Sequence, residues 1–417
     1  MDKLRITGGK TLRGRVAVAG AKNAALPALA ATLLTGDRVE LHNLPRVRDV
    51  RTMLRVLAQL GAQAEARPDG GADVRVDRIE SFEAPYDLVK TMRASVLVLG
   101  PLLARHGRAR VSLPGGCALG ERPIDLHIEA LRKLGAEITL QHGYVEAKAR
   151  RLRGGRYDFR TKTVTGTENL MMAATLAEGT TILGNCAREP EVIDLARLLG
   201  AMGASIHGAG SDEITIEGRE RLHGARHRVI PDRIEAGTYL VAGALIGDPV
   251  EVTGCDVEAM RPIVRQLEAA GVAIAVEGDA LRAGVPAKLT GQDLRTAPHP
   301  GYPTDMQAQY MTLMTQAAGT SVVTETVFEH RFMHVGELLR MGADIRIQGR
   351  SCVVVGPSRL TGAQVMATDL RASACLVLAA LAADGVSVLD RVYHLDRGYE
   401  AMEEKLRTLG AEVERIR

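Results

Sequence analysis

The sequence predicts an α/β protein of two lobes, built from six repeated units of about 70 residues with three units in each lobe. Two series of regularly spaced glycines support this prediction. The segments that precede them also support it, because those before one series are amphipathic and those before the other are almost wholly apolar. Each unit is expected to run strand, buried helix, strand, amphipathic helix, strand, strand. The length of 417 residues fits two lobes of ordinary domain size.

The first series of glycines follows six amphipathic segments, at intervals of 68 to 74 residues. Its members are Gly61, Gly135, Gly203, Gly271, Gly342 and Gly410. Segments such as 343–347, which alternate apolar and polar residues, come next. Glycine commonly closes a helix in the left-handed conformation, and alternation is typical of a half-buried strand. Each glycine therefore predicts the end of an outer helix and the start of a strand.

The second series of glycines follows almost wholly apolar segments, at intervals of 66 to 72 residues. Its members are Gly36, Gly107, Gly179, Gly247, Gly319 and Gly385. The segments 169–179 and 372–385 are examples of the apolar helices expected to end there. A helix that is apolar on all sides is buried. Twelve matched positions argue against chance similarity among unrelated elements.

The six units are compatible with one ring or with two globules, and the usual size of domains favours two. We place one lobe at 20–229 and the second at 1–19 plus 230–417, with the active site in the cleft between them. The polar stretch 221–233 marks the boundary, and the N-terminal strand is expected to complete the second lobe.

Composition excludes several classes of protein. A net charge of +3, 8 Tyr, 4 Phe and no Trp argue against a nucleic-acid binder. Five cysteines without a C-x-x-C pair argue against zinc or a disulfide framework. The N-terminus lacks the apolar stretch of a signal peptide, and no apolar run approaches the ~18 residues of a membrane span. We expect a soluble cytoplasmic monomer that uses no cofactor and no metal.

Polar residues precede every predicted buried helix. Ordinary capping explains Asp, Ser, Thr and Asn at these positions. Lysine and arginine oppose the helix dipole, so Lys22, Arg93 and Arg371 indicate an anionic ligand shared with it. The alternative is that these three cations simply pair with neighbouring carboxylates.

A loop at 113–123 contains three glycines, two prolines and Cys117. Such a loop is expected to be exposed, and Arg122 supplies positive charge beside the thiol, which are the conditions for a reactive cysteine. An inert surface cysteine is the alternative. The other four cysteines lie in apolar contexts and are expected to be inert. Arg397 stands before the last helix, where it binds an anion or forms an ion pair with Asp396 or Glu400.

Several long segments carry a resemblance to a known family. They are residues 19–27, 86–95, 113–126, 187–191, 231–238, 295–309, 324–334, 366–373 and 390–399. Through them the whole chain resembles the UDP-N-acetylglucosamine 1-carboxyvinyltransferases, the enolpyruvyl transferases that begin peptidoglycan precursor synthesis. The resemblance implies an inside-out α/β barrel of two lobes. It also implies phosphoenolpyruvate and UDP-N-acetylglucosamine as substrates.

The resemblance further implies a set of site residues. Cys117 would protonate the enol carbon, form the covalent phospholactoyl adduct and react with fosfomycin, and Asp305 would accept the proton of the sugar hydroxyl. The residues that would bind the substrates are Lys22, Asn23, Arg93, Arg122, Pro123, Ile124, Asp125, Leu126, Lys162, Thr163, Val164, Thr165, Val327, Asp369, Arg371 and Arg397, with Lys22 and Arg397 also catalytic. The chain departs from the family pattern at Arg48, where a lysine is expected, and at 162–165.

Two other interpretations stay open. One is the relative 5-enolpyruvylshikimate-3-phosphate synthase, against which the Cys117 loop argues. The other is a non-enzymatic ring of six repeats that encircles DNA, against which the small net charge argues.

Overall fold

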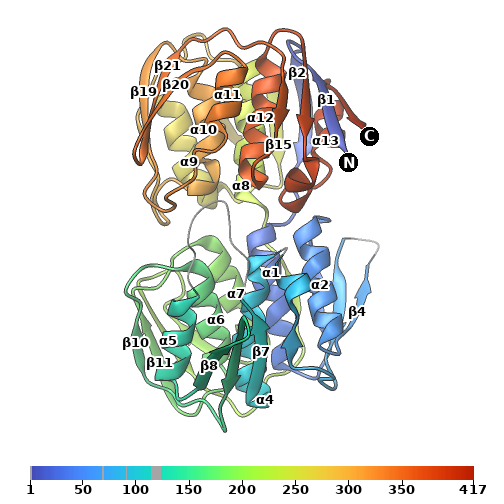
Figure 1. Ribbon diagram of the computed structural model, residues 1–417, viewed down its shortest axis with the longest axis vertical. Helices are drawn as coiled ribbons and strands as arrows, with labels where there is room; N and C mark the ends of the chain where they lie inside the picture. The colour runs from blue at the N-terminus through green and yellow to red at the C-terminus, as the bar shows by residue number, and fades with distance from the viewer. Residues whose placement is uncertain (1, 68–69, 91, 114–123) are drawn as a thin grey trace. The chain divides into compact units, whose positions relative to one another are not determined.

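The computed structural model describes residues 2–67, 70–90, 92–113 and 124–417 (Figure 1). These residues form two compact units. Unit 1 holds the residues up to Ala19 and Pro231–Arg417, and unit 2 runs from Gly20 to Ile230. Within the described ranges the strands form six four-stranded sheets, three in each unit.

The three sheets of unit 2 have the orders β14-β3-β5-β4, β6-β7-β9-β8 and β10-β11-β13-β12. Their strands are β3 (Val39–His42), β4 (Gln63–Ala66), β5 (Ala72–Arg75), β6 (Glu83–Ala84), β7 (Arg108–Ser112), β8 (Glu137–Gln141), β9 (Tyr144–Lys148), β10 (Arg156–Asp158), β11 (Thr180–Gly184), β12 (Ser205–His207), β13 (Glu213–Glu217) and β14 (Arg226–Arg228). In each sheet the first pair is parallel and the next two pairs are antiparallel.

The sheets of unit 1 repeat this pattern, with the orders β2-β15-β17-β16, β18-β19-β21-β20 and β22-β23-β1-β24. Their strands are β1 (Lys3–Thr7), β2 (Leu12–Ala17), β15 (Gly247–Thr253), β16 (Ile274–Glu277), β17 (Ala280–Ala283), β18 (Leu294–Arg295), β19 (Gly319–Thr324), β20 (Asp344–Gln348), β21 (Ser351–Gly356), β22 (Gln364–Met366), β23 (Val386–Asp390) and β24 (Glu412–Ile416). The N-terminal β1 is an inner strand of its sheet, between β23 and β24.

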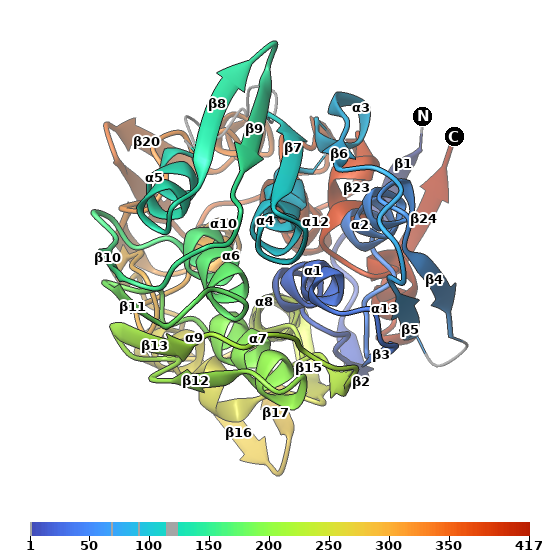
Figure 2. The ribbon, with the colours of Figure 1, turned by 90° about the horizontal axis from the view of Figure 1, so that it is seen from below.

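Buried helices occupy the middle of unit 2, and the sheets lie around them (Figure 2). The central helices are α1 (Lys22–Ala31), continued by η1 (Thr32–Leu34), then η2 (Arg93–Val98), continued by α4 (Leu99–His106), and α6 (Val164–Ala174). The amphipathic α2 (Arg48–Gln59), α5 (Asp125–Lys133) and α7 (Pro190–Ala201) pack against them, and α3 (Tyr86–Val89) is a short turn of helix.

Unit 1 is built in the same way (Figure 1). Its central helices are α8 (Arg233–Ile246), η3 (Thr304–Met306) with α10 (Gln307–Met314), and α12 (Leu370–Ala382). Its further helices are α9 (Val257–Ala269), α11 (Val335–Arg340), η4 (Val392–Arg397) and α13 (Met402–Thr408). All eight residues of α10 are buried, as are twelve of the fourteen residues of α8. The predicted order of elements and the burial of the apolar helices are confirmed.

The first series of glycines has the predicted conformation, since all six φ angles lie between 94° and 104°. The second series is only partly as predicted. Three of the buried helices end before the glycine, at Thr32, Thr175 and Thr315. Each threonine hydroxyl donates 2.7 Å to the carbonyl three residues earlier. The hydroxyl thus adds a second donor to a carbonyl in the last turn of the helix, which apolar periodicity alone did not indicate.

Candidate functional site

The structure places most of the predicted site residues at the starts of helices in the two units. In unit 2 they are Lys22 and Asn23 at the start of α1, Arg93 at the start of η2, Ile124, Asp125 and Leu126 at the start of α5, and Lys162, Thr163, Val164 and Thr165 at the start of α6. In unit 1 they are Asp305 in η3, Val327 after β19, Asp369 and Arg371 at the start of α12, and Arg397 at the end of η4. Cys117, Arg122 and Pro123 lie outside the described residues.

In unit 1 a carboxylate is held between two buried arginines. Arg331 Nη2 donates to Asp305 Oδ1 at 2.7 Å, and Arg371 Nε and Nη2 donate to Asp305 Oδ2 at 3.1 and 3.0 Å. Arg331 is 5% exposed and Arg371 1% exposed. Burial is the largest influence on the pKa of Arg371 and lowers it, but the charges of Asp305, Tyr399 and Asp232 and the hydrogen bond to Asp305 together raise the pKa above its usual value. Arg371 therefore stays charged.

Asp369 caps α12 and orients Arg371. Its Oδ1 accepts from the backbone N–H groups of Arg371, at 2.8 Å, and Ala372, at 3.0 Å. Gly398, next to Arg397, approaches α12 so closely that a Cβ there would lie 2.4 Å from the side chain of Leu370. The chain at Arg397 thus runs beside the helix start that carries Arg371.

Arg371 has one buried nitrogen, Nη1, that makes no hydrogen bond of regular geometry with the described residues, although the Tyr399 hydroxyl interacts with this guanidinium. A buried donor without a partner carries a free-energy cost of about 1–3 kcal/mol, so such a group is a candidate for binding a ligand. An anionic ligand beside Arg371 would accept from it and remove that cost.

A series of hydrogen bonds connects Val327 to Asp305. It begins at Glu325, a carboxylate that is 1% exposed. Glu325 accepts from the backbone N–H of Val327 at 2.7 Å and from the hydroxyl of Thr304 at 2.7 Å. Thr304 in turn accepts from Arg331 Nη1 at 2.8 Å. Arg331, Glu325 and Thr304 were missed by the sequence analysis. The segment 324–334 was part of the resemblance, but no local pattern assigns these side chains to Asp305.

In unit 2 the ammonium group of Lys22 lies 3.4 Å from Asp49 Oδ2, and both residues are buried. Lys22 and Arg371 therefore each pair with a carboxylate. The sequence analysis gave such pairing as the alternative to ligand binding for these cations. Ion pairing and ligand binding are compatible, because a buried cation needs a counter-charge before a ligand arrives.

The starts of α5 and α6 are joined by His127. Its Nε2 lies 3.3 Å from Thr165 Oγ1, and its Nδ1 lies 2.9 Å from Asn169 Nδ2. Burial lowers the pKa of His127 to about 4, so its ring is neutral. Asp125, on the exposed side of α5, forms an ion pair with Arg160.

The start of α6 is fixed by local contacts. The Thr163 hydroxyl caps the helix by accepting from Gly166 N at 3.2 Å, and Lys162 Nζ donates to the carbonyl of Cys186 at 3.0 Å. The segments predicted to contact the UDP-sugar in unit 2 are thus held together by hydrogen bonds.

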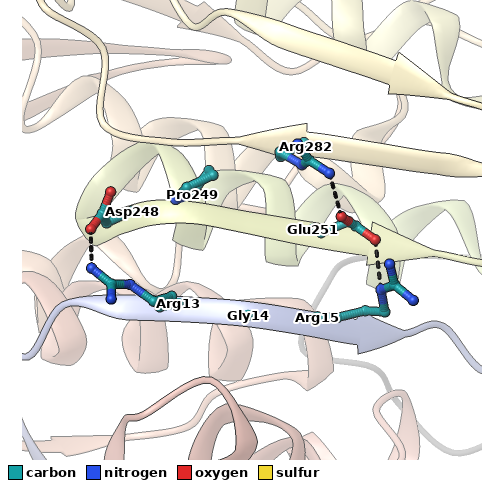
Figure 3. Close-up of a pocket in the computed structure, with 7 residues that line it drawn as sticks. All are labelled: Arg13, Gly14, Arg15, Asp248, Pro249, Glu251 and Arg282. Carbon is teal, nitrogen blue, oxygen red and sulfur yellow. Dashed lines mark hydrogen bonds and ion pairs between the residues drawn. The ribbon is translucent and has the colours of Figure 1, made fainter.

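The hollow drawn in Figure 3 lies elsewhere, on the outward surface of the sheet that contains β2, β15 and β17. Arg13 pairs with Asp248, and Glu251 pairs with Arg15 and Arg282. These side chains form a solvated set of surface ion pairs. No predicted site residue lines the hollow.

Neither a metal site nor a membrane-spanning helix is found in the described ranges. No group of three or more His, Cys, Asp and Glu side chains there is arranged to hold a metal ion. No helix among these residues has the length and apolar character needed to cross a membrane. Cys186, Cys255, Cys352 and Cys375 are buried free thiols.

Comparison with solved structures identifies the class of protein. The enolpyruvyl transferase NikO from Streptomyces tendae superposes with a TM-score of 0.91 at 29% identity, covering 99% of this chain and 98% of that one. EPSP synthase from Acinetobacter baumannii has the same fold, with a TM-score of 0.78 at 17% identity over the full length of both chains. The predicted inside-out α/β fold is confirmed.

Comparison with known sequences then places the chain within this class. The family model of EPSP synthase (3-phosphoshikimate 1-carboxyvinyltransferase) matches residues 6–406. The UDP-N-acetylglucosamine 1-carboxyvinyltransferase of Koribacter versatilis is 58% identical over 419 aligned positions, which cover 100% of this chain and 97% of the relative. The chain belongs to the EPSP synthase family of carboxyvinyltransferases, and it is a transferase enzyme.

Proposed function

We propose that this enzyme transfers the enolpyruvyl group of phosphoenolpyruvate to the 3-hydroxyl of UDP-N-acetylglucosamine and releases phosphate, at the first committed step of peptidoglycan synthesis. The observation that carries the proposal is Asp305, a carboxylate held by two buried arginines. The name of the full-length relative from Koribacter versatilis supports the choice of acceptor.

Asp305 is suited to act as the general base. Arg331 and Arg371 fix the direction of its carboxylate, because each donates to a different oxygen. The side chain stays 24% exposed, so a substrate hydroxyl has access to it. As that hydroxyl attacks C2 of phosphoenolpyruvate, its proton passes to Asp305.

Four cations among the predicted site residues are suited to the phosphate and the carboxylate of phosphoenolpyruvate. We assign this role to Lys22, Arg122 and Arg397, with Arg371 as a fourth positive charge, since preorganised cations stabilise the charged intermediate. Cys117 donates a proton to C3 while the new C–O bond forms at C2. In the second step C3 loses a proton and phosphate leaves C2, which restores the double bond in the product.

The test is phosphate release that requires both substrates. We expect Asp305→Asn to lower kcat at least about a hundredfold, within the range of general-base effects. Lys22→Ala should lower kcat/KM at least about tenfold, because it loses a charge-assisted contact worth about 1.5–3 kcal/mol. A fully active Asp305→Asn enzyme would exclude Asp305 as the base.

The second candidate function is the 5-enolpyruvylshikimate-3-phosphate synthase reaction, which the matching family model favours. It uses a hydroxyl of shikimate 3-phosphate as the acceptor in place of the sugar. Phosphate release measured with each acceptor separately decides between the two functions. Turnover with shikimate 3-phosphate alone would overturn the proposal.

A further inference from the structure

Three buried polar side chains of unit 1 form a hydrogen-bond network that reaches the backbone of Asp305. They are Thr238 in α8, Gln309 in α10 and Tyr399 after η4, and none is more than 2% exposed. Gln309 Nε2 lies 3.0 Å from the Tyr399 hydroxyl, and that hydroxyl lies 2.9 Å from Thr238 Oγ1. The network therefore joins three elements that meet at the starts of the central helices.

Gln309 Nε2 lies within hydrogen-bond distance of three acceptors, the carbonyl of Asp305 at 3.1 Å, the Tyr399 hydroxyl at 3.0 Å and Thr238 Oγ1 at 3.3 Å. Tyr399 then has its own proton available for Thr238, which donates to the carbonyl of Ile234 at 2.8 Å. A chain of this kind has fixed donors and acceptors, and each bond polarises the next.

The network contacts both partners of the Asp305–Arg371 pair. Gln309 holds the backbone of Asp305, while the ring of Tyr399 lies 5.3 Å from the guanidinium carbon of Arg371. Arg371 in turn donates twice to the Asp305 carboxylate. The carboxylate is thus oriented through its backbone by Gln309 and through its side chain by the arginine above Tyr399.

We propose that Tyr399, Gln309 and Thr238 are positioning residues that set the orientation of Asp305 and Arg371 for the transfer reaction. They act through Asp305 and Arg371 and do not contact the reacting atoms. The inference rests on the proposed role of Asp305 as the base. It predicts that removing one hydroxyl of the network lowers the rate of the chemical step while substrate binding is retained.

The main test compares Tyr399→Phe with Tyr310→Phe. Tyr310 is also a buried tyrosine of unit 1, and its hydroxyl bonds with Gln266 and Gln292 instead. Each variant loses the hydrogen bonds of one buried hydroxyl, so their Tm values should fall by similar amounts. We expect kcat to fall about tenfold in Tyr399→Phe only, with both KM values within about twofold, because small displacements of a catalytic group reduce rate steeply.

Thr238 provides a second pair of variants. Thr238→Val keeps the shape and removes the hydroxyl, whereas Thr238→Ser keeps the hydroxyl. We expect Thr238→Val to lower kcat as Tyr399→Phe does, and Thr238→Ser to restore most of it. Both hydroxyls belong to the same hydrogen-bond network. The fold-decrease of kcat in the double variant Thr238→Val with Tyr399→Phe should therefore be smaller than the product of the two single-variant decreases.

The results separate this inference from the proposed function. If Asp305→Asn is inactive while Tyr399→Phe matches Tyr310→Phe in kcat, the positioning role is wrong and the base assignment stands. If Asp305→Asn is active, the proposed function of Asp305 fails first. Equal loss of kcat in Thr238→Val and Thr238→Ser, or multiplicative losses in the double variant, would also overturn the network.

Discussion

At the scale of single residues, burial makes the four described cysteines unreactive. Burial raises the pKa of Cys186, Cys255 and Cys352 to about 12, and it raises the pKa of Cys375 as well. A thiol with such a pKa forms almost no thiolate at neutral pH and is a poor nucleophile. Cys117, outside the described residues, is left as the candidate for reaction.

We expect fosfomycin to modify Cys117 alone. Mass spectrometry should find one adduct, on the peptide that contains Cys117. Cys117→Asp should stay active, because it supplies a titratable proton, and should form no adduct. Cys117→Ser should be nearly inactive, because a hydroxyl is too weak an acid at working pH. An adduct on Cys186 with Cys117 unmodified, or a fully active Cys117→Ser enzyme, would contradict the assignment.

His127 gives a second prediction at this scale, about pH. Its pKa is lowered from 6.5 to about 4 by burial. Between these values the unfolded chain binds a proton that the folded protein does not, so stability is lost as pH falls from 6.5 towards 4. The loss is up to about 1.4 kcal/mol per pH unit. Calorimetry should show a smaller decrease of Tm over this range in His127→Gln than in the wild type; equal decreases would exclude His127 as the source.

At the scale of elements, the repeated pattern made the strand and helix order predictable, because periodicity and glycine act locally. The partners of the site residues were not predictable. Arg371 is 66 residues from Asp305, and Arg331 is 26 residues from it. Contacts of this kind depend on how the elements pack. The helix ends at Thr32, Thr175 and Thr315 show the same limit, since a threonine within an apolar run does not by itself indicate a terminus.

Two glycines test the packing of these elements. A Cβ on Gly218, just after β13, would lie 1.6 Å from the carbonyl oxygen of Ala177, whereas a Cβ on Gly200 in α7 meets nothing within 4 Å. Gly218→Ala should therefore destabilise the protein by about 1–3 kcal/mol. Gly200→Ala should stabilise it by about 0.5–1 kcal/mol, because alanine loses less entropy in a helix. Calorimetric Tm values of the two variants should shift in opposite directions. A raised Tm in Gly218→Ala would contradict the close contact between Gly218 and the carbonyl group of Ala177.

At the scale of the whole molecule, the described part of the chain passes between the units at Ala19–Gly20 and at Ile230–Pro231. Each passage lies between a strand and the central helix that follows it. Strand β2 precedes α1 of unit 2 but pairs with β15 of unit 1, and β14 precedes α8 of unit 1 but pairs with β3 of unit 2. Unit 1 therefore takes strands from two separate parts of the sequence, whereas every strand of unit 2 lies within residues 20–230.

The proposed function draws residues from both units, Lys22 from unit 2 and Asp305 from unit 1, to one pair of substrates. If one molecule of UDP-N-acetylglucosamine is bound by residues of both units, binding should restrict their relative motion and exclude water from the reaction. We expect small-angle scattering to show a smaller radius of gyration with UDP-N-acetylglucosamine than without it. Shikimate 3-phosphate at the same concentration is the control and should cause no change. A radius of gyration that UDP-N-acetylglucosamine leaves unaltered would show that the substrate does not draw the units together, and compaction with shikimate 3-phosphate alone would favour the second candidate function.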